Sequence, residues 1–283
     1  MNIKEIKSIL NQKDLVPLKQ LGQNFLINAG KIDRIVDLAG ISEEDNIVEL
    51  GVGLGSLTQA LARKAGHITG LEIDRGIISW HREKKTLPDN VSLLNQDMLK
   101  ADFRDLAERS GAPLKIIANL PYSIAGPLVF KLIRERPYIE WAVLMFQKEV
   151  ARRLTASPGS RDYGILSVLL AGCAEIEKLL DLGPAEFYPR PKVDSRVLKI
   201  RFQPTPARVK ALPDHDEELL IRIVKSAFQQ RRKTIAAALA NSQLLSLPKS
   251  DIVSALNRAG ISPRSRAEEV NVEEYAALTG QLE

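Results

Sequence analysis

Short apolar runs rich in β-branched residues alternate with amphipathic stretches between residues 46 and 146. The runs are N-I-V-E-L (46–50), H-I-T-G-L-E-I (67–73), V-S-L-L-N (91–95), L-K-I-I-A-N (114–119) and I-E-W-A-V-L-M-F (139–146). Between them, apolar residues recur at helical spacing, as in L-T-Q-A-L-A-R-K-A (57–65). This alternation is typical of parallel strands joined by crossover helices. We therefore expect an α/β fold built on a doubly wound, Rossmann-like sheet.

The pattern changes at residues 203–216, which contain three prolines and show no periodicity. Such a segment is typical of a linker. Beyond it, the stretches E-E-L-L-I-R-I-V-K-S-A-F, K-T-I-A-A-A-L and D-I-V-S-A-L-N-R-A-G have helical spacing without strand alternation. The sequence therefore predicts a first domain at 1–204 and a second, small all-helical domain at 205–283.

The composition, 45% hydrophobic and 27% charged over 283 residues, is that of an ordinary globular protein. The opening residues M-N-I-K-E-I-K-S-I-L place charges where a signal peptide would be apolar, and no apolar run approaches the roughly 20 residues that span a bilayer. We expect a cytoplasmic protein without a membrane partner.

The single cysteine, Cys173, lies in an apolar stretch, which predicts a core position and excludes both an internal disulfide and a thiolate metal cluster. The histidines His67, His81 and His215 are dispersed along the chain. No metal site is therefore expected.

Basic residues concentrate in one part of the predicted helical domain. The segment 219–250 has six of them and no acidic residue, within a chain of net charge +5. A solvated helix face would normally mix charges of both signs. The segment therefore indicates a surface that faces RNA phosphates, and its candidate contacts are Arg222, Lys225, Arg231, Arg232 and Lys233.

A glycine-rich segment, E-L-G-V-G-L-G (49–55), closes the first predicted strand and opens a helix. Glycines allow a sharp turn and a close approach to a ligand, although dinucleotide oxidoreductases use a similar loop. Acidic residues follow the next two strands. Glu72 is placed to accept hydrogen bonds from ribose hydroxyls, and Asp97 to accept from an adenine amino group. Together with Gly51, they predict an adenosyl ligand at the carboxyl ends of the strands.

The acid within this loop, Glu49, distinguishes between adenosyl cofactors. A carboxylate would repel the pyrophosphate of a nicotinamide cofactor, but it would attract the amino group and sulfonium of S-adenosylmethionine. The sequence therefore favours S-adenosylmethionine.

The tetrapeptide N-L-P-Y (119–122) ends the fourth predicted strand. An adenine exocyclic amine is a poor nucleophile, because its lone pair is delocalised into the ring. The Asn119 amide oxygen and the Leu120 carbonyl, each accepting one N–H, would free that lone pair for in-line attack. Pro121 stiffens the loop, and Tyr122 offers a ring on which a flipped base can stack. This pattern predicts methyl transfer to an adenine amine.

The sequence resembles the KsgA-type family of small-subunit ribosomal RNA adenine dimethyltransferases over nearly its whole length. The matching elements, in order, are L-G-Q-N-F-L (21–26), V-E-L-G-V-G-L-G-S-L-T (48–58), L-E-I-D (71–74), Q-D-M-L (96–99), N-L-P-Y (119–122), F-Y-P-R-P-K-V-D-S (187–195) and F-Q-Q-R-R-K-T (228–234).

The resemblance implies a class I methyltransferase sheet, and dimethylation of the N6 amine of two adjacent adenosines in a hairpin near the 3′ end of small-subunit rRNA. It also implies a role in small-subunit biogenesis on rRNA or a 30S-type particle, and we expect a monomer. In the family the N-terminal segment, here 1–45, covers the cofactor. That implies cofactor contacts for Asn24 and Leu26, beside Gly51, Glu72, Asp97 and Asn119, and a base-holding role for Phe187.

Other functions remain open at this point. A large-subunit rRNA methyltransferase of the antibiotic-resistance type would share the fold, cofactor and mechanism, but the F-Y-P-R-P-K-V-D-S and R-R-K-T elements favour the small-subunit type. A ribosome assembly factor in which catalysis is secondary is a second alternative. A zinc-dependent adenine deaminase is excluded, because it needs two cysteines in its metal site and the chain has one.

Overall fold

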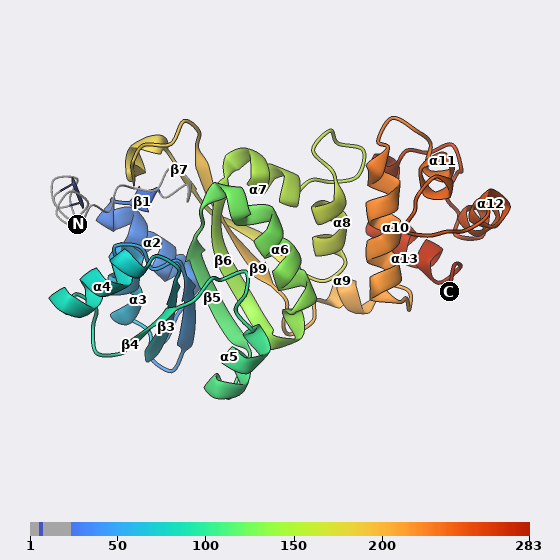
Figure 1. Ribbon diagram of the computed structural model, residues 1–283. Helices are drawn as coiled ribbons and strands as arrows, with labels where there is room; N and C mark the ends of the chain where they lie inside the picture. Colours follow the sequence, from blue (N-terminus) through green and yellow to red (C-terminus); the bar gives the residue numbers. More distant parts are fainter. Residues whose placement is uncertain (1–5, 8–23) are drawn as a thin grey trace. The chain divides into compact units, whose positions relative to one another are not determined.

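The computed structural model describes residues 6–7 and 24–283, and the chain forms two compact units (Figure 1). The first unit takes in the chain up to Ala151 together with Ile176–Pro204. The second consists of Arg152–Glu175 and Thr205–Glu283. The segment 21–23 of the first family motif, and most of the expected cofactor-covering segment 1–45 before residue 24, lie outside the described residues.

The first unit contains a seven-stranded sheet in the order β4-β3-β2-β5-β6-β9-β7. Neighbouring strands from β4 to β6 run parallel, and β9 runs antiparallel to β6. The sheet strands are β2 (Asn46–Leu50), β3 (His67–Glu72), β4 (Val91–Asn95), β5 (Leu114–Asn119), β6 (Ile139–Gln147), β7 (Glu175–Leu182) and β9 (Ser195–Arg201). The predicted α/β, doubly wound class is confirmed, and all five predicted strands are present.

Helices connect the parallel strands, as the helical spacing between the apolar runs predicts. They are α3 (Ser56–Ala62), α4 (Arg75–Lys84), α5 (Phe103–Ser110) and α6 (Ala125–Arg134), with the short 3-10 helices η2 (Tyr122–Ile124) and η3 (Arg136–Tyr138) on either side of α6. Helix α2 (Ala29–Ala39) precedes β2, α7 (Lys148–Leu154) follows β6, and the 3-10 helix η4 (Pro184–Glu186) follows β7. Asp74 fixes the start of α4 by accepting hydrogen bonds from the Gly76 and Ile77 N–H groups. The strand order reverses between β2 and β5, and open α/β sheets bind ligands at such a switch point.

A two-stranded sheet joins two distant parts of the chain beside this switch point. Strand β1 (Phe25–Leu26) pairs antiparallel with β8 (Phe187–Tyr188), with Phe25 opposite Tyr188 and Leu26 opposite Phe187. The Ile27 N–H extends the pairing to the Glu186 carbonyl at 2.9 Å. Leu26 and Phe187 are both part of the main hydrophobic core. This pairing anchors the start of the described segment to the F-Y-P-R-P element.

The second unit is helical, as the sequence predicts. It comprises α8 (Ile165–Ala171), α9 (Ala207–Lys210), α10 (Glu217–Gln229), α11 (Ile235–Ala240), α12 (Lys249–Arg258), η5 (Ala267–Glu269) and α13 (Val272–Thr279). In Figure 1 these helices run from green-yellow for α8 to red for α13. The sequence boundary at 204/205 coincides with the point where the chain passes into the second unit for the second time.

One segment lies in a different unit from the one expected from the sequence. Residues 152–175 were expected in the first domain, but the structure groups them with the second. The reason is α8, which packs against α10 and α13 and buries Val168, Leu169 and Leu170. Cys173, at the end of the same apolar stretch, is 7% exposed and buried as predicted.

Candidate functional site

A pocket lies at the carboxyl ends of β2, β3, β4 and β5. Residues from the predicted cofactor loop, both predicted acids and the N-L-P-Y loop line it together. The lining residues are Asn24, Phe25, Leu26, Glu49, Gly51, Val52, Gly53, Leu54, Ser56, Leu57, Glu72, Ile73, Gln96, Asp97, Met98, Leu99, Asn119, Pro121, Ser123 and Ile124. The fold thus gathers all six predicted cofactor residues in one place.

The glycine loop needs glycine for two physical reasons. Gly51 and Gly53 have φ of +84° and +54°, a backbone region that other residues rarely adopt. A Cβ on Gly53 would also lie 3.2 Å from the Phe25 ring, and one on Gly51 would lie 3.4 Å from the Met98 methyl group. The loop therefore lets the peptide backbone form the wall of the pocket.

Buried side chains hydrogen-bond to both the N–H and the carbonyl of Gly53. Its N–H donates to Glu72 Oε2 at 2.8 Å, and its carbonyl accepts from His81 Nε2 at 2.8 Å. His81 lies on α4 and is 3% exposed, and its burial lowers its pKa, which keeps the ring neutral. In the sequence, His81 was only one of three dispersed histidines. Nothing in its local sequence indicates the contact, because Gly53 is distant along the chain.

The two predicted acids each accept a hydrogen bond from a backbone N–H group in the loop that follows their strand. Glu72 is 4% exposed, and its Oε1 accepts from the Asp74 N–H at 2.9 Å. Burial raises its pKa, and the hydrogen bonds from the Asp74 and Gly53 N–H groups offset part of that increase. Asp97 Oδ1 accepts from the Leu99 N–H at 2.9 Å. Each carboxylate retains lone pairs for a ligand.

Two further features suit the pocket to an adenosyl cation. Ile73 is a large hydrophobic residue that is 49% exposed, and it lines the pocket next to Glu72, where its aliphatic side chain can cover an adenine ring. The described lining residues include three carboxylic acids and no lysine, arginine or histidine. A pyrophosphate would find no positive charge here, whereas a ligand with an ammonium and a sulfonium group is complementary to the pocket. The residues therefore fit S-adenosylmethionine.

Asn119 is fixed in one orientation. Its Nδ2 donates to the Asn24 carbonyl at 2.9 Å. Because a carbonyl only accepts, this contact assigns the nitrogen to the Asn24 side. The Oδ1 is then the atom of the amide that remains for a substrate N–H, as the predicted acceptor role requires. Asn24 supplies this contact through its backbone.

Of the other residues of the N-L-P-Y loop, Pro121 alone is among the described residues that line the pocket, and Tyr122 is not. Pro121 lines the pocket, and Leu120 is 3% exposed in the core, so only its carbonyl can serve as the predicted acceptor. Tyr122 begins η2 and is half-buried. Phe187 is 3% exposed, belongs to the main core and does not line the pocket. Its predicted base-holding role would require the ring to become accessible, and that role stays a prediction.

The Tyr122 side chain hydrogen-bonds to Ser195, a residue for which the sequence predicted no role. Its hydroxyl hydrogen-bonds to the Ser195 hydroxyl at 2.7 Å, and Ser195 is completely buried at the start of β9. Burial raises the Tyr122 pKa, so the phenol stays neutral. Ser195 closes the F-Y-P-R-P-K-V-D-S element, whose match to the family was the one signal that could have identified it. The bond limits the positions that the Tyr122 ring can take.

If this bond positions the ring for base stacking, Tyr122→Phe and Ser195→Ala should each slow methyl transfer roughly 3–10-fold, the usual effect of one hydrogen bond. The double variant should be no slower than either single variant, because both remove the same interaction. Single-turnover methyl transfer to undermethylated small subunits measures the three rates. Additive decreases would mean that the two residues act independently.

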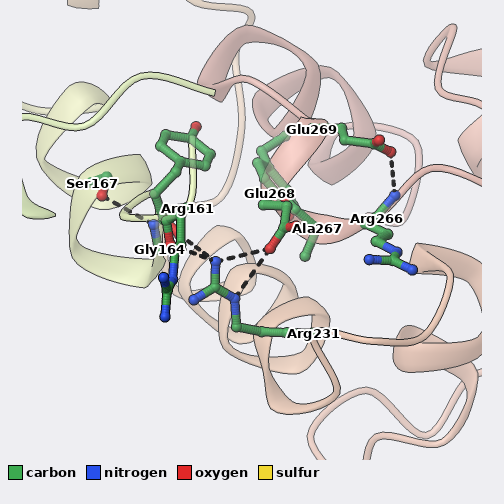
Figure 2. Close-up of polar contacts among 10 residues, drawn as sticks. Arg161, Gly164, Ser167, Arg231, Arg266, Ala267, Glu268 and Glu269 are labelled. Carbon is green, nitrogen blue, oxygen red and sulfur yellow. Dashed lines mark hydrogen bonds and ion pairs between the residues drawn. The ribbon is translucent and has the colours of Figure 1, made fainter. Parts of the chain in front are cut away.

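The predicted RNA-contacting residues lie in the second unit, on α10 and the turn that follows it. Arg222, Arg232 and Lys233 are exposed, and Lys225 is partly buried. Arg231 differs from them, because its guanidinium has internal partners. Figure 2 shows it between Glu268 and the loop that carries Arg161.

Arg231 Nη2 donates to Glu268 Oε2 at 2.8 Å and to the Arg161 and Tyr163 carbonyls at 3.0 and 3.3 Å. The Glu268 carbonyl in turn accepts from the Gly159 N–H at 2.7 Å. Arg231 therefore joins the 159–163 loop to η5. The structure gives it a role within the unit, and the phosphate contact expected from the sequence stays a prediction.

The described part of the chain offers neither a metal-ligand cluster nor a membrane-spanning helix. Among the described residues, no group of three or more histidine, cysteine, aspartate or glutamate side chains is arranged to hold a metal ion. No helix in residues 6–7 and 24–283 is long and apolar enough to cross a membrane.

Comparisons with known proteins agree with the architecture and the motifs. Residues 18–282 match the family model described as ribosomal RNA adenine dimethylase. Ribosomal RNA small subunit methyltransferase A of Desulfotalea psychrophila is 45% identical over 281 residues, covering 97% of this chain and 94% of the relative. The protein of the same name from Moorella thermoacetica is 41% identical over 283 residues, covering 98% and 96%.

Two solved structures are similar over nearly the whole chain. A dimethyladenosine transferase from Plasmodium falciparum has a TM-score of 0.74 at 26% identity, with 90% of this chain and 95% of that chain covered. The 23S rRNA methyltransferase ErmE has a TM-score of 0.65 at 28% identity, with 92% and 99% covered. With a family model matching almost every residue and relatives above 40% identity along nearly their whole length, the chain belongs to the ribosomal RNA adenine dimethylase family.

Proposed function

We propose that the chain uses S-adenosylmethionine to dimethylate the N6 amine of adenosines in small-subunit ribosomal RNA. The observation that carries this proposal is the fixed Asn119 amide, whose Nδ2 is bonded to the Asn24 carbonyl and whose Oδ1 is left for the substrate. Asn119 lines the same pocket as the two acids that suit an adenosyl group. Acceptor and cofactor would therefore meet at the end of β5.

The cofactor supplies a methyl group that its sulfonium has already activated, so no metal is needed. The protein contributes position and hydrogen bonding. Asn119 Oδ1 and the Leu120 carbonyl each accept one N–H of the adenine amine, which localises the nitrogen lone pair and directs it toward the methyl group. Tyr122, tethered by Ser195, provides the face on which the flipped base stacks. The proton released from the amine passes to solvent.

The same arrangement allows a second transfer. After the first methylation the amine still has one N–H, and one of the two acceptors can hold it while the lone pair attacks again. Ser123, beside Tyr122, is small and lines the pocket, which leaves room for the monomethylated amine to rotate. The expected product is N6,N6-dimethyladenosine, formed in two successive transfers on two adjacent adenosines near the 3′ end of the RNA.

Similarity supports the small subunit as the substrate. The curated relatives named for the small subunit are 41 and 45% identical to this chain, whereas the 23S rRNA methyltransferase is 28% identical. A large-subunit enzyme of the resistance type is therefore not favoured. An assembly factor without catalysis is not favoured either, because the acceptor amide and both acids are present in one pocket. We further expect the protein to act as a monomer in the cytoplasm, on rRNA or a 30S-type particle.

The decisive experiment offers the protein and S-adenosylmethionine to undermethylated small subunits and, separately, to large subunits. Mass spectrometry of the nucleosides, followed by mapping of the modified positions, reads the outcome. We expect dimethyladenosine in the small-subunit RNA and none in the large-subunit RNA. Methylation confined to the large subunit, or a product other than N6,N6-dimethyladenosine, would contradict the proposal.

For RNA binding we infer a surface formed by Arg222, Lys225, Arg232 and Lys233. The Ile235 N–H, at the start of α11, donates to the Ser265 carbonyl at 2.7 Å, so the segment around Ser265 lies beside the helix that follows this surface in the chain. Two variants, one of this surface and one of Arg231, test the two predicted roles separately. The double variant Arg232→Ala/Lys233→Ala should reduce RNA affinity and lower its salt dependence by about one unit for each phosphate that is no longer neutralised.

Arg231→Ala should act differently. It removes bonds to Glu268 and to two carbonyls, so it should lower the stability of the second unit by about 1–2 kcal/mol, a modest value because the pair is partly exposed. Salt titrations of RNA binding and thermal unfolding measure the two effects. If Arg231→Ala leaves unfolding unchanged and reduces the salt slope, Arg231 contacts phosphate after all.

A further inference from the structure

His81 contacts the glycine loop from α4, although it is not among the described residues that line the pocket. Its side chain is 3% exposed. The ring packs closely against the loop, because a Cβ on Gly55 would lie 3.1 Å from His81 Cε1. A side chain in this place can act on a ligand only through the loop that it supports.

The hydrogen bonds of the His81 ring fix its tautomer. The Gly53 carbonyl can only accept, so Nε2, which lies 2.8 Å away, carries the hydrogen. Burial lowers the His81 pKa and keeps the ring neutral, so Nδ1 is an acceptor and takes the hydroxyl hydrogen of Thr86. Thr86 follows α4, and its carbonyl accepts from the Gln59 side chain on α3. The ring is therefore held in one orientation, with its N–H directed at the loop.

Gly53 connects His81 to one of the acids that suit an adenosyl group. It has a φ of +54°, and its lack of a Cβ lets the two neighbouring peptide groups rotate more freely than at other residues. His81 fixes the carbonyl on one side, and Glu72 Oε2 accepts from the N–H on the other side at 2.8 Å. The second Glu72 oxygen accepts from the Asp74 N–H. The orientation of the Glu72 carboxylate therefore depends on Gly53, and that of Gly53 depends on His81.

We propose that His81 is a positioning residue for cofactor binding, which holds the Gly53 peptide so that the Glu72 carboxylate faces the ribose hydroxyls of S-adenosylmethionine. The inference rests on the cofactor placement in the proposed function, in which Glu72 accepts from the ribose. His81 itself touches neither the cofactor nor the RNA. It therefore contributes to cofactor affinity and leaves the methyl transfer to Asn119 and the rest of the N-L-P-Y loop.

Removal of the ring N–H should weaken cofactor binding and leave the chemical step intact. In His81→Leu the buried Gly53 carbonyl has lost its donor, which should weaken S-adenosylmethionine binding roughly tenfold. The rate of methyl transfer at saturating cofactor should stay within about twofold of that of the unaltered protein, because an interaction that is equal in the ground state and the transition state affects binding alone. Adenosine, which has the ribose but no methionine end, should be weakened by the same factor.

His81→Gln is the matched control. A glutamine amide can place an N–H donor near the position of Nε2, so this variant should regain most of the affinity that His81→Leu loses. Thr86→Val removes the hydroxyl that orients the ring and should weaken binding by a smaller factor, whereas Thr86→Ser keeps the hydroxyl and should bind as the unaltered protein does. The double variant His81→Leu/Thr86→Val should bind no more weakly than His81→Leu, because Thr86 acts through the ring.

Calorimetric titration measures the affinities, single-turnover transfer at saturating cofactor measures the rates, and thermal unfolding without cofactor measures stability. A purely structural role would lower the unfolding temperature of His81→Leu and leave its affinity unchanged, and that result would overturn the proposal. Equal affinities of His81→Leu and His81→Gln would overturn it as well. If His81→Leu does not fold, Thr86→Val and Thr86→Ser decide, and equal affinities of these two variants would reject the role of His81.

The unaltered protein and the adenosine titration separate this inference from the proposed function. If the unaltered protein does not bind S-adenosylmethionine, the cofactor placement is wrong and the inference fails with it. If it binds the cofactor and His81→Leu binds equally tightly, the role of His81 alone is rejected. A variant His81→Leu that binds adenosine normally and S-adenosylmethionine weakly would mean that the loop acts on the methionine end, which would overturn the link through Glu72.

Discussion

Asn119→Ala is expected to lower the rates of both methyl transfers on the order of 10²–10³-fold, the usual cost of removing one preorganised polar group from a site where charge develops. The effect should be large because Asn119 is positioned in advance by its bond to the Asn24 carbonyl. The amide oxygen therefore needs no reorganisation when the amine begins to attack. Cofactor affinity should fall much less, since the adenosyl group is held by other residues.

A time course on undermethylated small subunits that resolves monomethyladenosine from dimethyladenosine measures both steps. Asn119→Asp is the matched control. It keeps an acceptor oxygen for the amine but lacks the Nδ2–H that is bonded to Asn24, so it should be slower than the unaltered protein and faster than Asn119→Ala. A variant Asn119→Ala as fast as the parent would remove Asn119 from the mechanism. A plateau at the monomethyl product in the unaltered protein would contradict dimethylation.

Asp97→Ala is expected to weaken S-adenosylmethionine binding about 10–100-fold, the range for a hydrogen bond to a charged acceptor. Asp97 lines the pocket on the loop after β4, and Glu72 lines it at the end of β3. In the proposed placement of the cofactor, Asp97 accepts the adenine amino group. Its side chain also receives the Leu99 N–H, so the alanine variant disturbs the loop as well as the ligand contact.

The variant Asp97→Asn separates these two roles. Its amide oxygen can still accept from Leu99, whereas the charge and the second acceptor are removed. If the ligand contact dominates, calorimetric affinities of Asp97→Asn and Asp97→Ala should be similarly weak while both proteins unfold near the parent temperature. If Asp97→Asn binds the cofactor as tightly as the parent, Asp97 acts only on the loop.

The sequence by itself determined the sheet, the helical second unit and the place in the fold of four residues that line the pocket. The five apolar runs became strands because parallel strands buried on both faces need continuous apolar residues. Gly51, Glu72, Asp97 and Asn119 could be located because each closes or follows a strand, and the carboxyl ends of parallel strands meet at one edge of the sheet. Order along the chain thus implied proximity in space.

The tertiary structure alone decided contacts between segments that carry no shared local signal. Arg231 looked like its exposed neighbour Arg232, but folding places it against Glu268 and the 159–163 loop. The same packing assigns α8 to the second unit, because its apolar face is covered by α10 and α13. A charge or an apolar run has the same sequence signature whether solvent or another helix covers it, and only the long-range packing distinguishes the two.

Within the site, too, the sequence predicted the chemical groups and the tertiary structure decided their contacts. The sequence identified Glu49 as an acid in the loop, but its lack of any partner and of a nearby cation among the described lining residues are consequences of burial among β2, β3 and α3. The Tyr122–Ser195 bond joins residues 73 positions apart, and the Asn119–Asn24 bond joins residues 95 apart. Sequence alone defines which chemical groups are available, whereas the partner, orientation and protonation of each group depend on neighbours that only the folded chain brings within bonding distance.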